Sequence, residues 1–233
     1  MKHRTANCAN PGQFADIRAD NQDTVPLLHS YTVAYDSGFA PNPFNGFCTL
    51  ATCKPEIRKH AATGDWIIGT GSHKAGIRRG GFLVYAMRVQ ESLTFAKYWN
   101  DPRFARKKPN MHGSYRMACG DNIYCPTDEG GWYQLNSYHS RVDGTPHPKH
   151  LNRDTSVDRV LVSEEFVYFG AEGPPIPDKL KAARIVLAGR GRRKVTDTDT
   201  IAAFEAWLNE LDVQGYQGRP FDMVEAARKR AAQ

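Results

Sequence analysis

The sequence predicts an α+β protein built on a mixed, mostly antiparallel sheet, with short helices and a helical cap at its C-terminal end. Two observations lead to this fold class. Short apolar, partly β-branched runs bounded by turn residues recur along the chain, and the clearest helical period comes only after residue 198. With 40% hydrophobic and 24% charged residues, the 233-residue chain has the composition of a folded protein with one sizeable core.

The expected domain organisation has three parts. Residues 1–26 are polar and lack an apolar period, which predicts a flexible arm over residues 1–30. The main domain is expected over residues 31–190, followed by a C-terminal helical extension over residues 191–233. No run approaches the roughly 18 apolar residues that span a bilayer, and the N-terminus lacks an apolar signal-peptide core. We therefore expect a cytoplasmic protein without membrane contact.

The first half of the main domain should hold three strands and one short helix. Apolar and polar residues alternate from Tyr31 to Tyr35, which predicts the first strand. A rigid loop follows over residues 37–46, where two prolines and two glycines lie within ten residues. The other elements expected in this half are a helix over residues 54–62, capped by Thr52 or Cys53, and strands over residues 66–69 and 82–89.

The second half begins with a long region of loops. Residues 101–156 carry Pro, Gly, Asn and Asp too densely for long elements, and long loops in a compact domain commonly build sites. Further strands are expected over residues 160–162, 166–169 and 184–187. The C-terminal cap should consist of a helix capped by Thr198, with Ile201, Phe204, Leu208 and Leu211 on one face, and a second helix from Arg219.

Charge indicates a polyanionic partner. The formal net charge is +6, which favours phosphate groups but equally suits a soluble basic protein. The basic residues gather in two clusters, as a surface that follows phosphates would require. These clusters are Arg103, Arg106, Lys107 and Lys108, and Arg190, Arg192, Arg193 and Lys194.

The cysteine spacing does not favour a metal site. Cys48 and Cys53 are separated by four residues, and Cys119 and Cys125 by five. Structural zinc sites typically use two to about four intervening residues together with a second ligand pair. We expect these cysteines to be small buried side chains, and we predict neither a metal nor another cofactor.

One glycine-rich segment could hold a phosphate. In residues 69–74, Gly69 and Gly71 allow close backbone approach, while Ser72 and Lys74 offer a hydroxyl and a cation. The spacing matches neither a dinucleotide-binding fingerprint nor a P-loop, so a plain hairpin turn is the alternative interpretation. Motifs of serine hydrolases, zinc proteases and kinases are absent from the sequence.

Three scattered residues are the candidates for acid–base catalysis: Asp36 at a strand end, Asp121 in a turn, and His139. A histidine oriented by a carboxylate could act as a general base. The alternative is that the two aspartates cap turns and that His139 satisfies a buried backbone group. Among the many aromatic residues, Trp132 and Tyr133 follow two glycines and are the best placed for a pocket rim.

Several long blocks of sequence resemble the nucleotide modification associated domain 2 family. The blocks occur in order over roughly residues 31–190, at residues 35–44, 48–58, 64–72, 83–89, 98–104, 120–124 and 167–170. The resemblance implies a role in phage or bacterial nucleotide-modification systems, with nucleic acid or a modified nucleotide as partner. The order of elements is also similar to that of PUA-like domains such as EVE and ASCH, a fold-level likeness that implies a partly open barrel and a pocket for a modified base.

The leading functional hypothesis is binding of a modified base or nucleotide. Its pocket is expected between the loop 36–54, the turn 69–74 and the loops 120–140, with aromatic rings stacking the base. The nucleotide-binding residues are predicted to be Asn42, Lys54, Arg58, Gly69, Gly71, Ser72, Lys74, Asn122, Tyr124 and Tyr168.

Two alternatives remain open. The protein could be an enzyme acting on such a nucleotide, of transferase or glycosylase type, with Asp36, Asp121 and His139 as catalytic residues. It could instead be a non-catalytic accessory subunit of a modification complex, docked through its C-terminal helices. The sequence leaves the base, the kind of nucleic acid and the oligomeric state undetermined.

Overall fold

The computed structural model describes residues 25–73 and 79–225, and Lys74 and most of the predicted N-terminal arm lie outside them. The fold belongs to the predicted α+β class. Its main sheet has six strands in the order β10-β1-β3-β4-β9-β11, mostly antiparallel, and is not closed into a barrel. The strands are β1 (Leu28–Val33), β3 (Trp66–Gly71), β4 (Leu83–Arg88), β9 (Phe166–Tyr168), β10 (Arg192–Val195) and β11 (Gly215–Tyr216).

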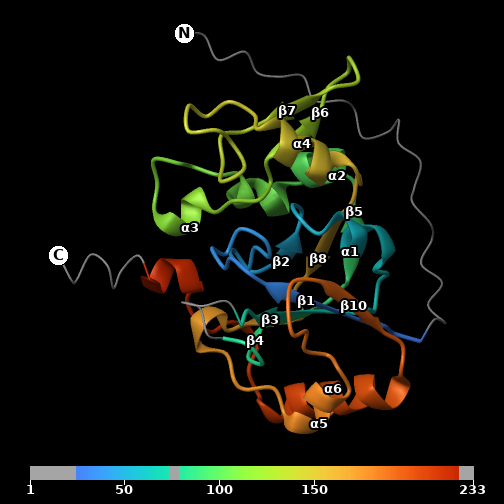
Figure 1. Ribbon diagram of the computed structural model, residues 1–233. Helices are drawn as coiled ribbons and strands as arrows, with labels where there is room; N and C mark the ends of the chain where they lie inside the picture. The colour runs from blue at the N-terminus through green and yellow to red at the C-terminus, as the bar shows by residue number, and fades with distance from the viewer. Residues whose placement is uncertain (1–24, 74–78, 226–233) are drawn as a thin grey trace.

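The other strands form two smaller sheets. In the first, β2 (Cys48–Leu50), β8 (Val160–Ser163) and β5 (Glu91–Leu93) pair antiparallel. In the second, β6 (Tyr124–Pro126) and β7 (Trp132–Gln134) form a hairpin. Figure 1 shows both on the same side of the main sheet.

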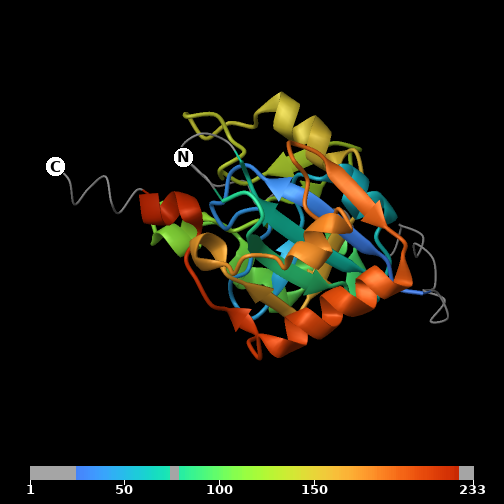
Figure 2. The same cartoon turned by 60° about the horizontal axis from the view of Figure 1, so that its bottom comes forward.

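The helices are short except for one. α6 (Thr198–Glu210) runs across one face of the main sheet together with α5 (Asp178–Ala182) (Figure 2). On the opposite side lie α1 (Pro55–His60), α2 (Phe95–Asn100), α3 (Tyr115–Ala118), α4 (Pro148–Thr155) and the 3-10 helix η2 (Pro102–Lys107) (Figure 1). A second 3-10 helix, η3 (Gly170–Glu172), follows β9, and residues 221–225 are helical.

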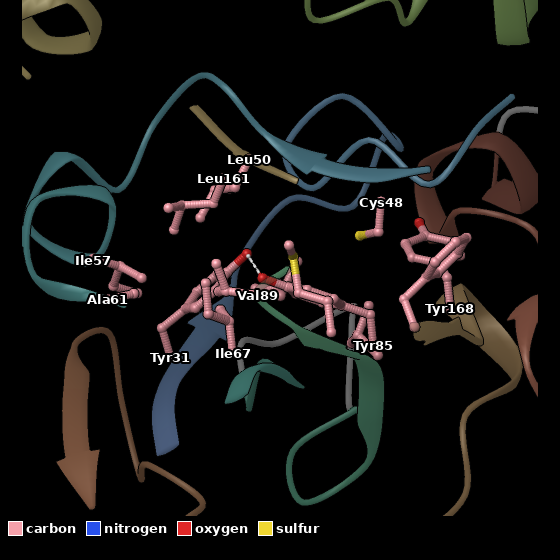
Figure 3. Close-up of a cluster of buried hydrophobic side chains, with 14 residues drawn as sticks. Tyr31, Cys48, Leu50, Ile57, Ala61, Ile67, Tyr85, Val89, Leu161 and Tyr168 are labelled. Carbon is pink, nitrogen blue, oxygen red and sulfur yellow. Dashed lines mark hydrogen bonds between the residues drawn. The ribbon is translucent and has the colours of Figure 1, made fainter. Parts of the chain in front are cut away.

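The central strands are buried on both faces because the sheet is covered on both sides. Successive side chains of a strand point to opposite faces. Leu28 and Ile68 accordingly belong to the apolar cluster under α5 and α6, whereas Tyr31 and Ile67 belong to the cluster that faces β2 and α1. Figure 3 shows the second cluster, in which the Tyr85 hydroxyl donates a hydrogen bond to the Tyr31 hydroxyl at 3.0 Å.

Most of the predicted elements are present. The helix expected over residues 54–62 is α1, and Ile57 and Ala61 are buried as predicted. The long helix begins at Thr198, but its cap is Asp197, whose carboxylate accepts from the Thr200 amide at 2.9 Å. Among the described residues, no helix is long and apolar enough to cross a bilayer.

One predicted strand is wrong. Residues 184–187 form a turn after α5 instead of a strand. Arg184 has a φ of 61°, which reverses the chain, and the Ile185 amide bonds back to the Leu180 carbonyl. The apolar run is buried as expected, because Ile185 belongs to the core, but it fills the space between the helices and the sheet.

The sheet crosses the boundary expected at residue 190. β10 pairs antiparallel with β1, so residues on both sides of that position belong to the same sheet. This pairing brings the basic cluster of residues 190–194 to the edge of the main sheet, beside α1 (Figure 1).

Candidate functional site

The site is centred on Cys53, which lies between β2 and α1. Cys53 and the following Lys54 have φ angles of 59° and 43°, in the left-handed region that residues other than glycine rarely adopt. Such backbone strain costs on the order of 1 kcal/mol or more per residue and tends to occur at functional sites. Two hydrogen bonds hold this conformation: the Cys53 amide donates to Asp154 Oδ1 at 2.9 Å, and Arg58 Nε donates to the Cys53 carbonyl at 3.0 Å.

His139 lies beside the thiol. Its Nε2 is 3.7 Å from Cys53 Sγ, and its Nδ1 is 2.6 Å from Asp154 Oδ2. The ring packs edge-on against Phe39, with 4.6 Å between centroids, and the residue is only 8% exposed. Cys53, His139 and Asp154 therefore form a thiol–imidazole–carboxylate array, in which the carboxylate fixes the orientation of the imidazole toward the sulfur.

Asp154 is the most heavily bonded member of the array. It is fully buried near the end of α4 and accepts four hydrogen bonds. Oδ1 accepts from the Cys53 amide and from Arg153 Nε at 2.9 Å, while Oδ2 accepts from His139 and from the Tyr124 hydroxyl at 3.0 Å. Burial alone would raise the pKa of this carboxyl, but the contacts with His139 and Arg153 outweigh it and lower the pKa to about 2.

The surroundings of His139 raise its pKa above the ordinary value of an imidazole. Burial by itself lowers the pKa of the imidazole, but the hydrogen bonds with Asp154 and Cys53 dominate and raise it to about 9. Nδ1 faces Asp154 Oδ2 at 2.6 Å, and Nε2 faces Cys53 Sγ at 3.7 Å. The ring is thus placed to carry a proton between the sulfur and a bound molecule.

Arg153 adds a second cation beside the sulfur. Its Nη2 donates to Cys53 Sγ at 3.5 Å and lies 3.4 Å from His139 Nε2, while its Nε is bonded to Asp154. The Arg153 guanidinium therefore offers a charged hydrogen-bond donor to the sulfur and to any group bound beside it. Arg153 is half-exposed and reaches the surface of the pocket described below.

Arg58 supports the site from behind. Its side chain is fully buried and donates to the backbone carbonyls of Cys53, Val157 and Arg159 at 2.6–3.0 Å, and also to that of Asp154. The fork of the guanidinium thereby ties the start of α1 to the end of α4. It connects the two segments that carry the thiol and the carboxylate.

Cys53 opens into a pocket of about 550 Å³ at the edge of the main sheet. The pocket lies between residues 31–35 of β1 and the chain after it, the start of α1, and the segment that leads into β10. Its lining includes four cationic residues, Lys54, Arg153, Arg190 and Arg192, against a single acidic one, Glu56. The aromatic rings of Tyr31 and Tyr35 also contribute, and Tyr35 is 65% exposed. The pocket thus combines a nucleophile with an excess of positive charge.

Cys53, His139 and Asp154 offer ligand atoms within 4.8 Å of one another, which is close enough for a metal centre. The donor set fits a metal poorly. Both oxygens of Asp154 are already occupied by two donors each, and the Arg153 guanidinium lies against the sulfur and the imidazole nitrogen that a metal would need. A divalent cation would have to displace that guanidinium.

Besides Arg58, the structure brings three of the residues predicted from sequence to this site. His139 is part of the array, and Tyr124 donates to Asp154. Lys54 lines the pocket with its Nζ 4.2 Å from the centre of the Tyr31 ring, and burial lowers its pKa. Of the pocket walls expected, the loop 36–54 contributes, whereas residues 69–74 and 120–140 are not among the lining residues.

The other two candidate catalytic residues lie in separate networks. Asp36 is buried and accepts from the Tyr168 hydroxyl and from the Phe221 amide, which joins β9 to the C-terminal segment. Burial raises its pKa to about 6. Asp121 is fully buried and accepts from the hydroxyls of Thr49 and Tyr98, each at 2.7 Å.

The remaining predicted binding residues mostly bond to the backbone. Asn42 donates to the carbonyls of Gly38 and Cys119 and accepts from the buried Lys107, and Asn122 donates to two carbonyls. A side chain on Gly69 would meet the Tyr85 ring at 2.5 Å, so packing requires this glycine. A side chain on Gly71 would likewise meet the Arg79 carbonyl oxygen, at 2.1 Å. Ser72 is buried, and Arg58 lies behind the pocket.

Sequence reasoning missed Cys53, Arg153 and Asp154. The spacing of the cysteines predicts small buried side chains. Cys48 and Cys119 are buried, but Cys53 is partly exposed. One signal was present: Cys53 comes directly before a Lys-Pro pair that opens a helix, within a sequence block shared with the family. Arg153 and Asp154 carry no local signal, because their roles depend on contacts across about 100 residues.

The fold and the site define an α+β protein in which a cysteine contacts a histidine, and the histidine contacts an aspartate, beside a cationic pocket. The chain belongs to the nucleotide modification associated domain 2 family, whose model matches residues 25–227. This confirms the resemblance seen in the sequence and extends it through β10, α6 and β11. The family description connects the chain with nucleotide modification. Comparison with curated proteins and with solved structures gives no match.

Proposed function

We propose that this protein is a cysteine-dependent transferase or hydrolase of nucleotide modification, in which Cys53 attacks a carbonyl carbon on a phosphate-bearing nucleotide. The observation that carries the proposal is the contact of Cys53 Sγ with His139, which Asp154 orients, at the wall of a cationic pocket. An enzyme is thus favoured over a pure binding protein, because binding alone needs no nucleophile oriented in this way.

The first half of the reaction forms a thioester. The Cys53 thiolate adds to the carbonyl carbon, and the electron pair of the C=O bond moves to oxygen. Arg153, within 3.5 Å of the sulfur, is placed to donate hydrogen bonds to that oxyanion. When the carbonyl re-forms, the bond to the leaving group breaks and His139 gives the leaving group its Nε2 proton.

The second half restores the enzyme. A water molecule or an amine attacks the thioester carbon, and the now neutral His139 accepts its proton. The C–S bond breaks and Cys53 leaves as a thiolate beside the renewed imidazolium. Asp154 keeps its bond to Nδ1 throughout, so the same nitrogen, Nε2, serves as acid and base.

The pocket lining supports a nucleotide as the substrate. Cationic side chains that outnumber the acidic one suit a phosphate, and a tyrosine ring can stack on a base. The same features support a second candidate, recognition of a modified base without chemistry. The two candidates differ in what they require of Cys53.

Alkylation with iodoacetamide tests the proposal. We expect Cys53 to react much faster than the buried Cys48 and Cys119, and we expect His139→Ala to slow the reaction at Cys53. Peptide mass spectrometry after short exposure measures each site, and Cys119→Ser is the matched control that should change nothing at Cys53. Equal alkylation of Cys53 and Cys119, or no effect of His139→Ala, would contradict an activated nucleophile and leave recognition as the better account.

A further inference from the structure

The basic residues beside the pocket extend beyond it. Arg190 and Arg192 line the pocket, and the chain continues from them into β10, the edge strand of the main sheet. The next basic residue on the same face is Lys194, which is exposed. Its face is known from the register, because Arg192 lies opposite Tyr31 and Lys194 opposite His29 on β1, two residues apart.

The spacing of these cations matters for what they can bind. Alternate residues of a strand lie about 6.6 Å apart and point to the same side. That separation is comparable to the distance between successive phosphates of an extended nucleic-acid strand. Pairing beyond β10 keeps the segment straight, since the Thr32 amide donates to the Gly191 carbonyl at 3.4 Å.

The charges are largely available to a ligand. Within the part of the chain that the structure describes, Arg190 and Lys194 form no ion pair, and Arg192 has one exposed pair with Glu56 at 3.1 Å. Exposed ion pairs contribute at most about 1 kcal/mol, so a phosphate can replace this one at low cost. A free nucleotide within the pocket would leave Lys194 unused, because Lys194 does not belong to the lining.

The size of the pocket sets the number of nucleotides inside. A volume of about 550 Å³ is in the range that holds one drug-sized group. One nucleotide can therefore reach Cys53, and any neighbours must lie outside. A base that enters such a pocket has left its stack, which costs least when the strand is single.

We infer that the substrate is a nucleotide within a single-stranded nucleic acid, whose neighbouring phosphates bind Arg190, just before β10, and Arg192 and Lys194 on β10. This inference rests on the proposed function for the identity of the reacting residue, but it concerns binding alone. It distinguishes a polymeric substrate from a free nucleotide, which the sequence left open.

The test uses fluorescence anisotropy with a labelled single-stranded oligothymidylate and the full chain carrying Cys53→Ser, which prevents turnover. Lys194→Ala should weaken binding several-fold and reduce the slope of log affinity against log salt by about 0.7. The matched control is Arg193→Ala. Arg193 lies on the same strand but pairs with Ser30 and faces α5 and α6, so its loss should have little effect.

Competition with thymidine monophosphate completes the test. We expect the mononucleotide to compete only at far higher concentration than the oligonucleotide, and its affinity should not change in Lys194→Ala. Equal effects of Lys194→Ala and Arg193→Ala, or equal affinity for monomer and oligomer, would overturn the inference. Because nothing is turned over, such a result would leave the chemistry at Cys53 to be judged by alkylation alone.

Discussion

At the scale of single residues, the site combines a strained backbone at Cys53 with the buried pair of His139 and Asp154. Two consecutive residues adopt positive φ angles, and a carboxylate with a lowered pKa is placed beneath the sulfur. Proteins keep such features where the surrounding contacts compensate for them and where they serve a function. Each feature has a measurable effect on stability or turnover, which leads to three predictions.

The first prediction concerns backbone strain. Replacing Cys53 by glycine should give a protein that is more stable than the Cys53→Ala variant by about 0.5–1 kcal/mol, because glycine adopts a φ of 59° without steric cost. Urea denaturation of both variants measures the difference. Ile57, which lies in α1 with helical backbone, provides the control site, since there the same comparison should favour alanine. A glycine variant that is less stable than the alanine variant at position 53 would show that this backbone is unstrained.

The second prediction concerns pH. Because the folded-state pKa of His139 is raised from 6.5 to about 9, its pairing stabilises the fold fully below about pH 6.5 and is lost as the pH rises through about 9. The free-energy difference between the wild type and His139→Gln should therefore be on the order of 2 kcal/mol at pH 6 and shrink by pH 10. Denaturation curves across this range measure it. A difference that stays constant with pH would contradict the raised pKa.

The third prediction concerns Asp154. In Asp154→Asn, the amide cannot accept from all four donors at once and can leave His139 in the wrong tautomer. We expect turnover to fall by about 10²- to 10⁴-fold and stability to fall by a few kcal/mol. The matched comparison is Tyr124→Phe, which removes one of the four hydrogen bonds and should have a much smaller effect on turnover. Turnover by Asp154→Asn near that of the wild type would contradict the role of the carboxylate.

At the scale of elements, the site depends on the connection between α1 and α4. Neither helix has a side-chain cap at its start, and both begin with proline. Their relative position is fixed by Arg58, which bonds to carbonyl groups before α1 and at the end of α4. The guanidinium thus holds the segment that carries Cys53 against the end of α4.

Arg58→Lys should therefore destabilise the protein by about 3 kcal/mol, although the charge is kept, because an ammonium group cannot reproduce the fork that reaches separate carbonyls. Thermal unfolding measures the loss, and Lys59→Arg at the neighbouring exposed position is the control, expected within about 0.5 kcal/mol of the wild type. A comparably mild effect of Arg58→Lys would show that α1 and α4 are positioned by other contacts.

The elements also show how far sequence reasoning reaches. Strands and helices with a clear period are predicted well, because burial on one or both faces leaves that pattern in the sequence. The segment 184–187 is mistaken for a strand because a buried apolar turn has the same composition as a short strand. In the site, His139 is predicted from its polar surroundings, but its partners are 86 and 15 residues away, a pairing that no local pattern encodes.

At the scale of the whole molecule, the pocket lies where the main sheet meets the loops and short helices that cover one of its sides. The main sheet supplies β1 and the segment 190–192 at the start of β10, while the other side supplies Cys53, the start of α1, and Arg153 of α4. The family match runs across both parts, through residue 227. The segment 190–192, which leads into β10, is therefore integral to the pocket, because it provides two of the four cations.

We expect Cys53 to form a covalent acyl intermediate. The intact mass of the protein after brief exposure to p-nitrophenyl acetate at neutral pH tests this. We predict one added acetyl group, located on Cys53 by peptide mapping, in the wild type and in Cys119→Ser, and none in Cys53→Ser. Equal acetylation of the wild type and Cys53→Ser, or acetylation that maps to another residue, would contradict it.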